Sequence, residues 1–524
     1  MKSWVPLILV LASCSSESGG GAASPGPSDA AGTGDAGAPD APTGSDASAP
    51  PPVEWAACDT TDWPTAYPKP SKETECASIE VPLDRGDLSG ATLALRVARQ
   101  RASANPTGRV VFVLEGGPGG SAVFTSGMIP QALPGVLGSF DLVYVDSRGT
   151  GGSGYLGCPK QPTAQADWLA CAKANAGVPL GHYLSSDNAR DLEAVRVRLG
   201  YDRIHIFATS YGTRVAFEYL RLFEDKVVAG VLDGVAPPPT DLFTNSVTSG
   251  DRGVALLVSD CEADPACTAV APNLAANLLE RRAVLEQTPR PITVDGKQAY
   301  EALEDYVALL HALMRDAGWR YRVPKAIHSA LAGDHTLWNL LMTEALGAKI
   351  ADAVSPAAPP SPPLFAPGLA GRLEPAGFGA EFSSRAVNAA VLCAEALPNS
   401  PGVAALNALF AQQLWGTKSI VDKANTCAAW AVAPLPETER QLVSSSRPLL
   451  LLSGVVDINL DPKWAKIALS KLEQAHLIEV PYAAHLPSYV PCVGKIDVQF
   501  LEADGDHSKV DDSCLNTLPA PGWN

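Results

Sequence analysis

The sequence has few features of a membrane-spanning or nucleic-acid-binding protein. None of its internal apolar runs is long enough to span a bilayer, which excludes a polytopic membrane protein. Lys and Arg contribute 39 residues against 56 Asp and Glu, so the formal net charge is −17. Nucleic acids and anionic lipid surfaces are bound through clustered basic side chains, so we expect neither as a partner. The composition, 46% hydrophobic and 18% charged, is that of a folded globular protein.

The sequence also lacks the short repeats that hold most metal ions. No two cysteines have Cys-x-x-Cys spacing, and the eight histidines include no His-Glu-x-x-His pair. We therefore expect no metal site, and an organic cofactor is not expected either. Isolated histidines such as His205 and His476 are interpreted as ordinary surface or core residues.

Cysteine, in contrast, is abundant, and the odd number of 11 needs an explanation. Near the N-terminus, Lys2 precedes an apolar stretch over residues 4–11 and the sequence Leu-Ala-Ser-Cys, which ends at Cys14. This order is typical of a secretory signal, and its last four residues resemble the lipobox of bacterial lipoproteins. The resemblance implies cleavage before Cys14 and lipid attachment to its thiol. We expect an extracytoplasmic lipoprotein, in the outer membrane or periplasm, that contacts membranes only through this anchor; an ordinary secreted protein is the alternative.

If Cys14 carries a lipid, ten cysteines remain that can pair outside the cytoplasm. Short loops are the easiest to close, so neighbouring cysteines are expected to pair. The predicted disulfides are Cys58–Cys76, Cys158–Cys171, Cys261–Cys267, Cys393–Cys427 and Cys492–Cys514.

The chain divides by composition into a tether and a folded body. Residues 15–53 are dominated by Gly, Ala, Ser, Thr, Pro and Asp, which cannot bury enough apolar surface to offset chain entropy, so a flexible tether is expected after the signal and lipobox of residues 1–14. In the body, continuous apolar runs alternate with helical sequence such as 188–199, which is typical of a parallel sheet covered on both faces. The first strand-like runs are 93–97, 110–114, 142–145, 204–207 and 228–232.

The sequence after residue 240 has a different pattern. Apolar positions recur every three or four residues over 274–285 and 300–315, which predicts helices, and 355–367 is a Pro-rich loop. Strand-like runs return at 449–452 and 477–480. We therefore predict an α/β fold. Its core is expected over 54–239 and 441–524, with an inserted helical cap over 240–440.

A serine follows one of the predicted strands at a sharp turn. The run 204–207 leads through Ala208 to Ser210, and helical sequence follows. A serine in this place, with small residues two positions before and after it, is typical of the nucleophile elbow of α/β-hydrolases. Gly212 meets this pattern, and Ala208 replaces the usual glycine. The alternative is an ordinary turn whose serine caps the helix.

A glycine-rich loop follows the run 110–114. It reads Gly-Gly-Pro-Gly-Gly between Glu115 and Ser121, so its backbone N–H groups are not shielded by side chains. Such groups can hold the oxyanion of an acyl-transfer reaction. A flexible turn and a phosphate-binding loop are the alternatives. The second lacks the Gly-Lys-Ser/Thr ending of a P-loop and the glycine spacing of a dinucleotide site.

These two motifs resemble those of the proline iminopeptidase and tripeptidyl aminopeptidase family. A third motif supports the resemblance, the sequence Asp-Ser-Arg-Gly-Thr-Gly-Gly-Ser over 146–153. The resemblance covers most of residues 55–515. It implies an α/β-hydrolase fold with a mostly parallel central sheet and an inserted helical cap, and a serine peptidase that needs no metal or cofactor. The family usually has His where this chain has Glu115, a change that leaves the backbone donors in place.

A catalytic triad also needs an acid and a base that follow the serine in the chain. Asp457 comes after the run 449–452, where the family places its acid, and Asp461 and Asp233 are the alternatives. His485 comes after the run 477–480 and is predicted to be the base, with Ala484 where the family usually has Gly. His485, supported by Asp457, would take the proton of Ser210.

The rest of the predicted site concerns the oxyanion and the substrate. The N–H groups of Gly117 and Tyr211 are expected to hold the oxyanion. An aminopeptidase must also recognise a free α-ammonium, and Glu395 lies where the family tends to carry an acidic residue after a cysteine; a helix-surface glutamate is the alternative. We predict an aminopeptidase that releases N-terminal residues or short peptides from a peptide substrate. A secreted esterase or amidase of the same fold and an inactive surface binding protein are the alternatives.

Overall fold

The computed structural model describes residues 52–61, 63–64, 67–103, 108–294, 297–346, 383–520 and 522–523. The predicted signal and lipobox (1–14, with Cys14), nearly all of the tether (15–53) and the Pro-rich loop 355–367 lie outside these residues. The remaining predictions fall on the compact unit Val53–Asn524.

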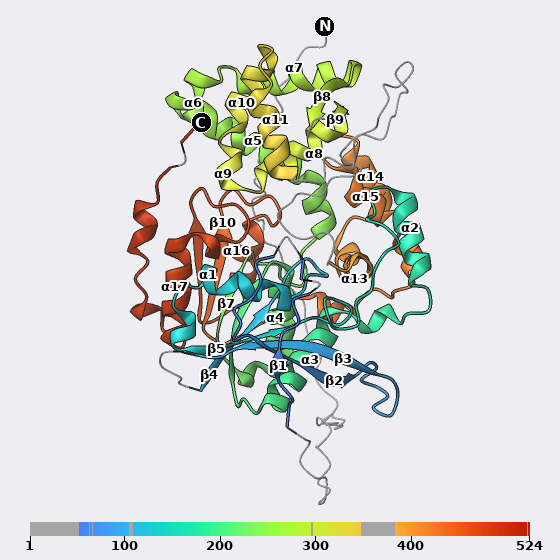
Figure 1. Ribbon diagram of the computed structural model, residues 1–524, viewed down its shortest axis with the longest axis vertical. Helices are drawn as coiled ribbons and strands as arrows, with labels where there is room; N and C mark the ends of the chain where they lie inside the picture. The colour runs from blue at the N-terminus through green and yellow to red at the C-terminus, as the bar shows by residue number, and fades with distance from the viewer. Residues whose placement is uncertain are drawn as a thin grey trace, which may run out of the picture. The chain divides into compact units, whose positions relative to one another are not determined.

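A nine-stranded mixed sheet forms the centre of this unit (Figure 1). In spatial order its strands are β1 (Ala56–Ala57), β2 (Glu75–Pro82), β3 (Thr92–Gln100), β5 (Phe140–Val145), β4 (Arg109–Leu114), β6 (Ile204–Thr209), β7 (Val227–Asp233), β10 (Leu449–Gly454) and β11 (Ala475–Val480). The six strands from β5 to β11 pair in parallel, whereas β1, β2 and β3 pair antiparallel. The predicted α/β class with a mostly parallel sheet is therefore confirmed.

Helices cover both faces of this sheet, as its apolar strands predict. In β4, Val110, Phe112 and Leu114 belong to one core cluster, while Val111 and Val113 belong to another. The first cluster includes residues of α3 (Ser185–Leu199) and α4 (Tyr211–Phe223), and the second includes residues of α17 (Pro491–Glu502). Figure 1 shows α3 and α17 on opposite sides of the strands.

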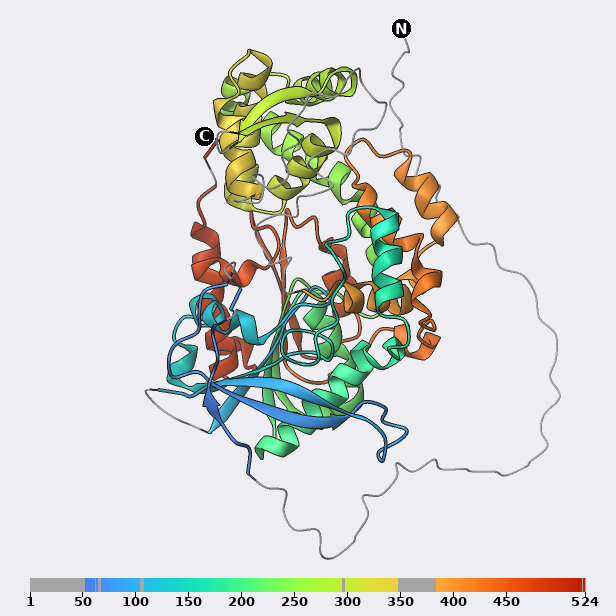
Figure 2. The same cartoon turned by 45° about the vertical axis from the view of Figure 1, so that its right-hand side comes forward.

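A second group of helices has a core of its own. It is built from α5 (Leu242–Ala263), α7 (Leu274–Gln287), α8 (Leu303–Met314), α10 (Val323–Leu331) and α11 (Thr336–Leu346), around the fully buried Trp338. Figures 1 and 2 both show α7, α10 and α11 gathered away from the blue strands β2 and β3. Among the described residues, no single helix has both the length and the apolar composition to cross a bilayer, although the bent pair Arg385–Asn399 and Val403–Phe410 reaches that threshold when taken together.

The later helices of the predicted cap pack differently. Residues of α13 (Arg385–Val391) and of the π-helical turn η7 (Leu392–Ala396) belong to the core cluster of the sheet, not to that of α5–α11. The domain boundaries at 240 and 440 stay a prediction. Within them, the buried side chains divide among three clusters, because Phe243 and Val247 of α5 pack with Leu392 and Ala396 of η7 in a smaller one.

One predicted helix begins too early. Tyr300 and Glu301 lie in β9 (Lys297–Glu301), which pairs antiparallel with β8 (Arg290–Val294), so the helix predicted from residue 300 starts instead at Leu303. The carboxylate of Asp305 accepts a hydrogen bond from the N–H of Ala302 at 2.7 Å, which fixes the start of α8. Apolar spacing did not reveal this cap or the hairpin before it.

The described residues contain five disulfides, and they are the five predicted pairs. They are Cys58–Cys76, Cys158–Cys171, Cys261–Cys267, Cys393–Cys427 and Cys492–Cys514. Their sequence separations run only from 6 to 34 residues, so each closes a short loop. Cys492–Cys514 ties the start of α17 to the C-terminal segment.

Candidate active site

Ser210 lies on a sharp turn between β6 and α4. Its backbone has φ 52° and ψ −123°, a conformation in which a side chain is strained. The turn is held because the N–H of Ser210 donates to the carbonyl of Asp233 at 2.7 Å and its own carbonyl accepts from the N–H of Thr213 at 3.0 Å. A Cβ on Gly212 would lie 2.4 Å from the carbonyl oxygen of Leu114, so only glycine lets α4 approach β4 this closely. This is the local geometry that the elbow motif predicts.

The glycine-rich loop lies directly against the serine. A Cβ on Gly116 would be 2.7 Å from Cβ of Ser210, so no larger residue fits there. Residues of the α13 region fasten the loop: the side-chain amide of Asn388 donates to the carbonyl of Pro118 at 2.9 Å, and the N–H of Ser384 donates to the carbonyl of Gly119 at 2.9 Å. The loop backbone is therefore fixed beside the nucleophile candidate.

Two backbone N–H groups were predicted to hold the oxyanion. Tyr211 is the first residue of α4, and the first N–H groups of a helix have no intrahelical acceptor. The helix dipole adds a partial positive charge at this end. Gly117 is the second glycine of the adjacent loop and is exposed. Both groups thus lie on the two segments that flank Ser210, and their role as oxyanion donors stays a prediction.

Asp457 and His485 form a buried acid–base pair. Nδ1 of His485 lies 2.7 Å from Oδ2 of Asp457. The other oxygen, Oδ1, accepts hydrogen bonds from the N–H groups of Asn459 and Leu460 at 2.7 and 3.1 Å, so the fully buried carboxylate is held in one orientation. Burial alone would lower the pKa of His485, but the charge and hydrogen bond of Asp457 outweigh it and raise that pKa above its ordinary value of 6.5.

The sheet order brings this pair to the same edge as the serine. Ser210, Asp457 and His485 follow the carboxyl ends of β6, β10 and β11, and β6, β7, β10 and β11 are consecutive in the sheet. A Cβ on Gly234 would lie 2.9 Å from Cε1 of His485, and the preceding residue, Asp233, accepts the Ser210 N–H. Both the base and the serine therefore contact the end of β7. The catalytic roles of the three residues stay a prediction.

The two alternative acids have other partners. Asp461 lies 3.5 Å from Nε of Arg252 and caps the N–H of Lys463 at 3.0 Å. Asp233 is fully buried, and its Oδ2 accepts a hydrogen bond from the N–H of Ser488 at 3.0 Å, while its Oδ1 has no hydrogen-bond partner among the described residues. Burial raises the pKa of Asp233 to about 7. Of the three candidate acids, Asp457 is the one that contacts His485.

The motif over 146–153 supports the loops of the site. Asp146 is fully buried, and its carboxylate accepts hydrogen bonds from Ser121 Oγ at 2.6 Å and from the N–H groups of Val123 and Gly152 at 3.0 and 2.9 Å. Arg148 donates to both carboxylate oxygens of Asp191 at 2.8 and 2.7 Å. The contacts of Asp146 anchor the end of the glycine-rich loop, and those of Arg148 join the motif to α3. The motif therefore has a structural role.

Glu115, noted in the sequence as a replacement of the family's usual histidine, is an ionisable group of the site to which sequence reasoning assigned no role. Burial raises the pKa of its carboxyl to about 7, partly offset by the Gly116 N–H and by His485. Its Oε2 accepts a hydrogen bond from the hydroxyl of Thr209 at 3.5 Å, next to Ser210. A carboxyl with a pKa near neutrality therefore lies near the proposed base.

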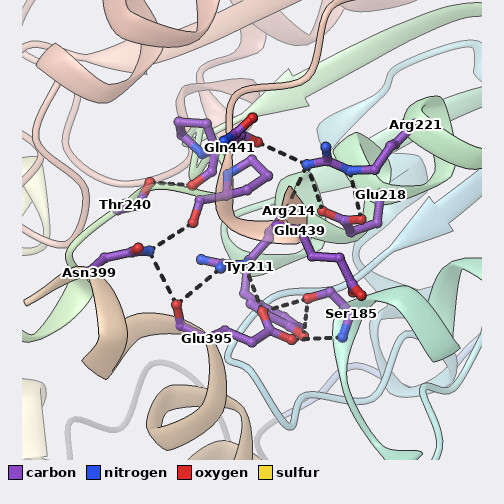
Figure 3. Close-up of polar contacts among 12 residues, drawn as sticks. Ser185, Tyr211, Arg214, Glu218, Arg221, Thr240, Glu395, Asn399, Glu439 and Gln441 are labelled. Carbon is purple, nitrogen blue, oxygen red and sulfur yellow. Dashed lines mark hydrogen bonds and ion pairs between the residues drawn. The ribbon is translucent and has the colours of Figure 1, made fainter. Parts of the chain in front are cut away.

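Glu395 has different partners from those predicted. Its Oε2 lies 2.6 Å from Nε of Arg214, and both side chains are 1% exposed. Oε1 accepts a hydrogen bond from the N–H of Ser185 at 2.8 Å and Oε2 accepts one from its hydroxyl at 2.8 Å, as Figure 3 shows. That hydroxyl also lies 2.7 Å from the hydroxyl of Tyr211. Recognition of an α-ammonium by Glu395 stays a prediction, but in this geometry both oxygens are occupied within the protein.

The network around Glu395 was not predictable from the sequence. Arg214 lies on α4 and Glu395 on η7, so 181 residues separate the two groups that meet. The nearest signal was Cys393, whose disulfide with Cys427 holds η7. Through Arg214 and Tyr211, the network fastens η7 to the helix that begins at the nucleophile elbow.

Two family models match the chain. A model described as the α/β hydrolase fold matches residues 109–295, and one described as TAP-like protein matches residues 412–514. The serine protease Hip1 of Mycobacterium tuberculosis is 29% identical over 215 residues, and the tripeptidyl aminopeptidase of Streptomyces lividans is 29% identical over 216 residues. Each match covers 36% of this chain, with 41% of the first protein and 39% of the second. The chain thus spans well under half the length of these curated relatives.

The sheet order, the elbow and the first family model define the class. The chain has the α/β-hydrolase fold, and its elbow serine with a neighbouring Asp–His pair is an arrangement typical of serine hydrolases. The second model spans Asp457 and His485, and together with the two relatives it confirms the predicted resemblance to the tripeptidyl aminopeptidase group.

Proposed function

We propose that this protein is an extracytoplasmic serine aminopeptidase that uses Ser210, His485 and Asp457 to release N-terminal residues or short peptides. The observation that best supports this function is the meeting of the elbow serine, the glycine-rich loop and the Asp457–His485 pair at the carboxyl ends of neighbouring strands. In this mechanism His485 takes the Ser210 proton, and Oγ attacks the scissile carbonyl carbon. The N–H groups of Gly117 and Tyr211 then stabilise the oxyanion.

The second half of the cycle reverses these proton transfers. The imidazolium of His485 gives its proton to the leaving amine, so the peptide bond breaks and an acyl-enzyme remains on Ser210. A water molecule, deprotonated by His485, then attacks the ester and releases the acyl product. Asp457 stabilises the imidazolium through its 2.7 Å contact with Nδ1.

Labelling with a fluorophosphonate probe tests the catalytic part of the proposal. We expect one label per molecule of the wild-type protein and none on Ser210→Ala. Absence of labelling, or equal labelling of the variant, would contradict the assignment and favour a binding protein.

The exopeptidase part needs a separate test, because the same machinery hydrolyses esters and amides. A tripeptide anilide with a free amine should be cleaved faster than its N-acetylated form. The ratio of its cleavage rate to that of a short p-nitrophenyl ester should also be higher for this protein than for a simple esterase. Equal cleavage of the free and acetylated peptides would remove exopeptidase specificity and leave the serine hydrolase.

Location outside the cytoplasm is supported by the five disulfides, since such bonds persist in oxidising compartments. Attachment through a lipid at Cys14 is a further part of the proposal. Metabolic labelling with a radioactive fatty acid should mark the wild-type protein and not Cys14→Ser. Equal labelling of both would exclude Cys14 as the lipidation site.

A further inference from the structure

Two histidines and an aspartate meet at the far end of the edge strand β11. His476 is the second residue of β11, His507 begins the turn η12 (His507–Lys509), and Asp512 precedes the turn η13 (Ser513–Thr517). Each offers one ligand atom, and the three atoms lie within 4.8 Å of one another. His485 follows the opposite end of β11, so this cluster is separate from the candidate active site.

One buried polar atom of the cluster has no hydrogen-bond partner among the described residues. Nδ1 of His507 is buried and has no hydrogen-bond partner in the part of the chain that the structure describes. A buried polar atom in this state costs roughly 1–3 kcal/mol, so it normally has a ligand or water. The two imidazole rings are stacked with centroids 3.6 Å apart, and the side chain of Asp512 makes no capping hydrogen bond to η13.

We propose that His476, His507 and Asp512 bind a divalent transition-metal ion of the Zn²⁺ class. Imidazole nitrogen and carboxylate oxygen are ligands that Zn²⁺ takes at about 2.0–2.2 Å, whereas Ca²⁺ and Mg²⁺ prefer oxygen alone. Two ligands of one tetrahedral Zn²⁺ ion lie about 3.4 Å apart, so side-chain rotation, easiest for the exposed Asp512, is needed to bring the three atoms together. Three protein ligands leave a position for water.

This site departs from the sequence expectation of no metal, because its ligands have no short repeat. The ion would join β11 to the segment after α17. The disulfide Cys492–Cys514 already ties this segment, near Cys514, to the start of α17. An ion that binds the folded state and not the unfolded chain stabilises the fold. The proposed ion therefore has a structural role, as a cross-link at the edge of the sheet.

The test uses the full-length chain without a histidine tag, treated with EDTA and kept free of thiol reductants so that the disulfides stay intact. Titration calorimetry with Zn²⁺ should show one equivalent bound, and saturating Zn²⁺ should raise Tm by about 2 °C. Co²⁺ should give visible absorption bands that Zn²⁺ abolishes by displacement. His507→Ala and Asp512→Asn should each lose the bound equivalent and the Tm rise, and the control His335→Ala should keep both.

Zn²⁺ binding that is absent in the wild type, or unchanged in both variants, overturns the proposal. Asp512→Asn carries the test if His507→Ala fails to fold, because Asp512 is exposed and makes no cap. Neither variant touches the candidate active site, so fluorophosphonate labelling of Ser210 should be unaffected. The metal site and the proposed catalysis can therefore fail independently.

Discussion

Two acid–base pairs lie near the nucleophile elbow, and they do different things. Asp457 contacts His485 at 2.7 Å, and Glu395 contacts Arg214 at 2.6 Å. The members of the first pair are 28 residues apart in the chain, and those of the second are 181 apart. They differ in the base, because a histidine can lose its proton near neutral pH and an arginine cannot.

This difference separates a pair that can do chemistry from one that can only hold structure. In the first pair the proton can move to and from a neighbouring hydroxyl, and the carboxylate stabilises the charged form of the base. In the second pair the base is an arginine, which cannot give up its proton, and the contact holds η7 against α4. The predictions below test whether rate and stability separate in this way.

The largest expected effect is on rate. Ser210→Ala should lower kcat/KM by about 10⁴-fold or more, because the nucleophile is lost while the rest of the site remains. Its free energy of unfolding, measured in guanidinium chloride, should change by less than about 1 kcal/mol. Ser329→Ala, which alters a serine of α10, should keep full activity. A Ser210→Ala variant with substantial residual peptidase activity would contradict the proposed mechanism.

The second effect is on stability. Arg214→Met should destabilise the protein by about 3–5 kcal/mol, because it leaves the 1% exposed carboxylate of Glu395 without its charge partner. The double variant Arg214→Met with Glu395→Gln should recover part of that loss. Denaturant unfolding of the wild type, both single variants and the double variant gives the coupling energy. Additive losses would show that the pair is not coupled.

A smaller effect concerns the third buried carboxyl, Asp233, beside the first pair. Its pKa is about 7 in the folded state against an ordinary 3.8, so the folded protein binds a proton more tightly and loses stability as pH rises between these values. Asp233→Asn should therefore gain roughly 1–3 kcal/mol over the wild type at pH 8 and nothing at pH 4. The exposed Asp225 provides the control, and Asp225→Asn should show no such gain.

The smallest effect is a shift in the pH profile. The proposed mechanism needs neutral His485, whose pKa is raised above 6.5, so kcat/KM should fall as pH drops through that raised pKa. Asp457→Asn removes the charge that raises the pKa of His485, so the acid limb of the residual activity should move to a lower pH. A limb that does not move would show that His485 is not the titrating group.

Local motifs predicted much of the site. The elbow around Ser210, the glycine-rich loop and the five disulfides follow from short-range patterns, because each depends on neighbours in the chain. The predicted start of α8 was wrong because apolar spacing does not reveal the cap at Asp305 or the β8–β9 hairpin.

Long-range contacts explain the rest. The sequence did not reveal that Glu395 meets Arg214, or that His476, interpreted as an ordinary residue, lies beside His507 and Asp512. Nor did it reveal that α13 shares a core with the sheet, that most of α5–α11 has its own core, and that η7 contributes to the sheet's core and to a smaller cluster with the start of α5.

By itself, the sequence of this protein determined the fold class, the disulfide pairs and the residue types available for acyl transfer. Strand patterns, short loops and glycine turns are local, so they can be recognised without coordinates. Only the tertiary structure decided which carboxylate contacts His485, which one pairs with arginine, and which buried polar atoms of the C-terminal segment have no hydrogen-bond partner among the described residues. Those outcomes depend on the order of strands in the sheet, which sets the distances between side chains, and on burial, which changes the cost of a charged group.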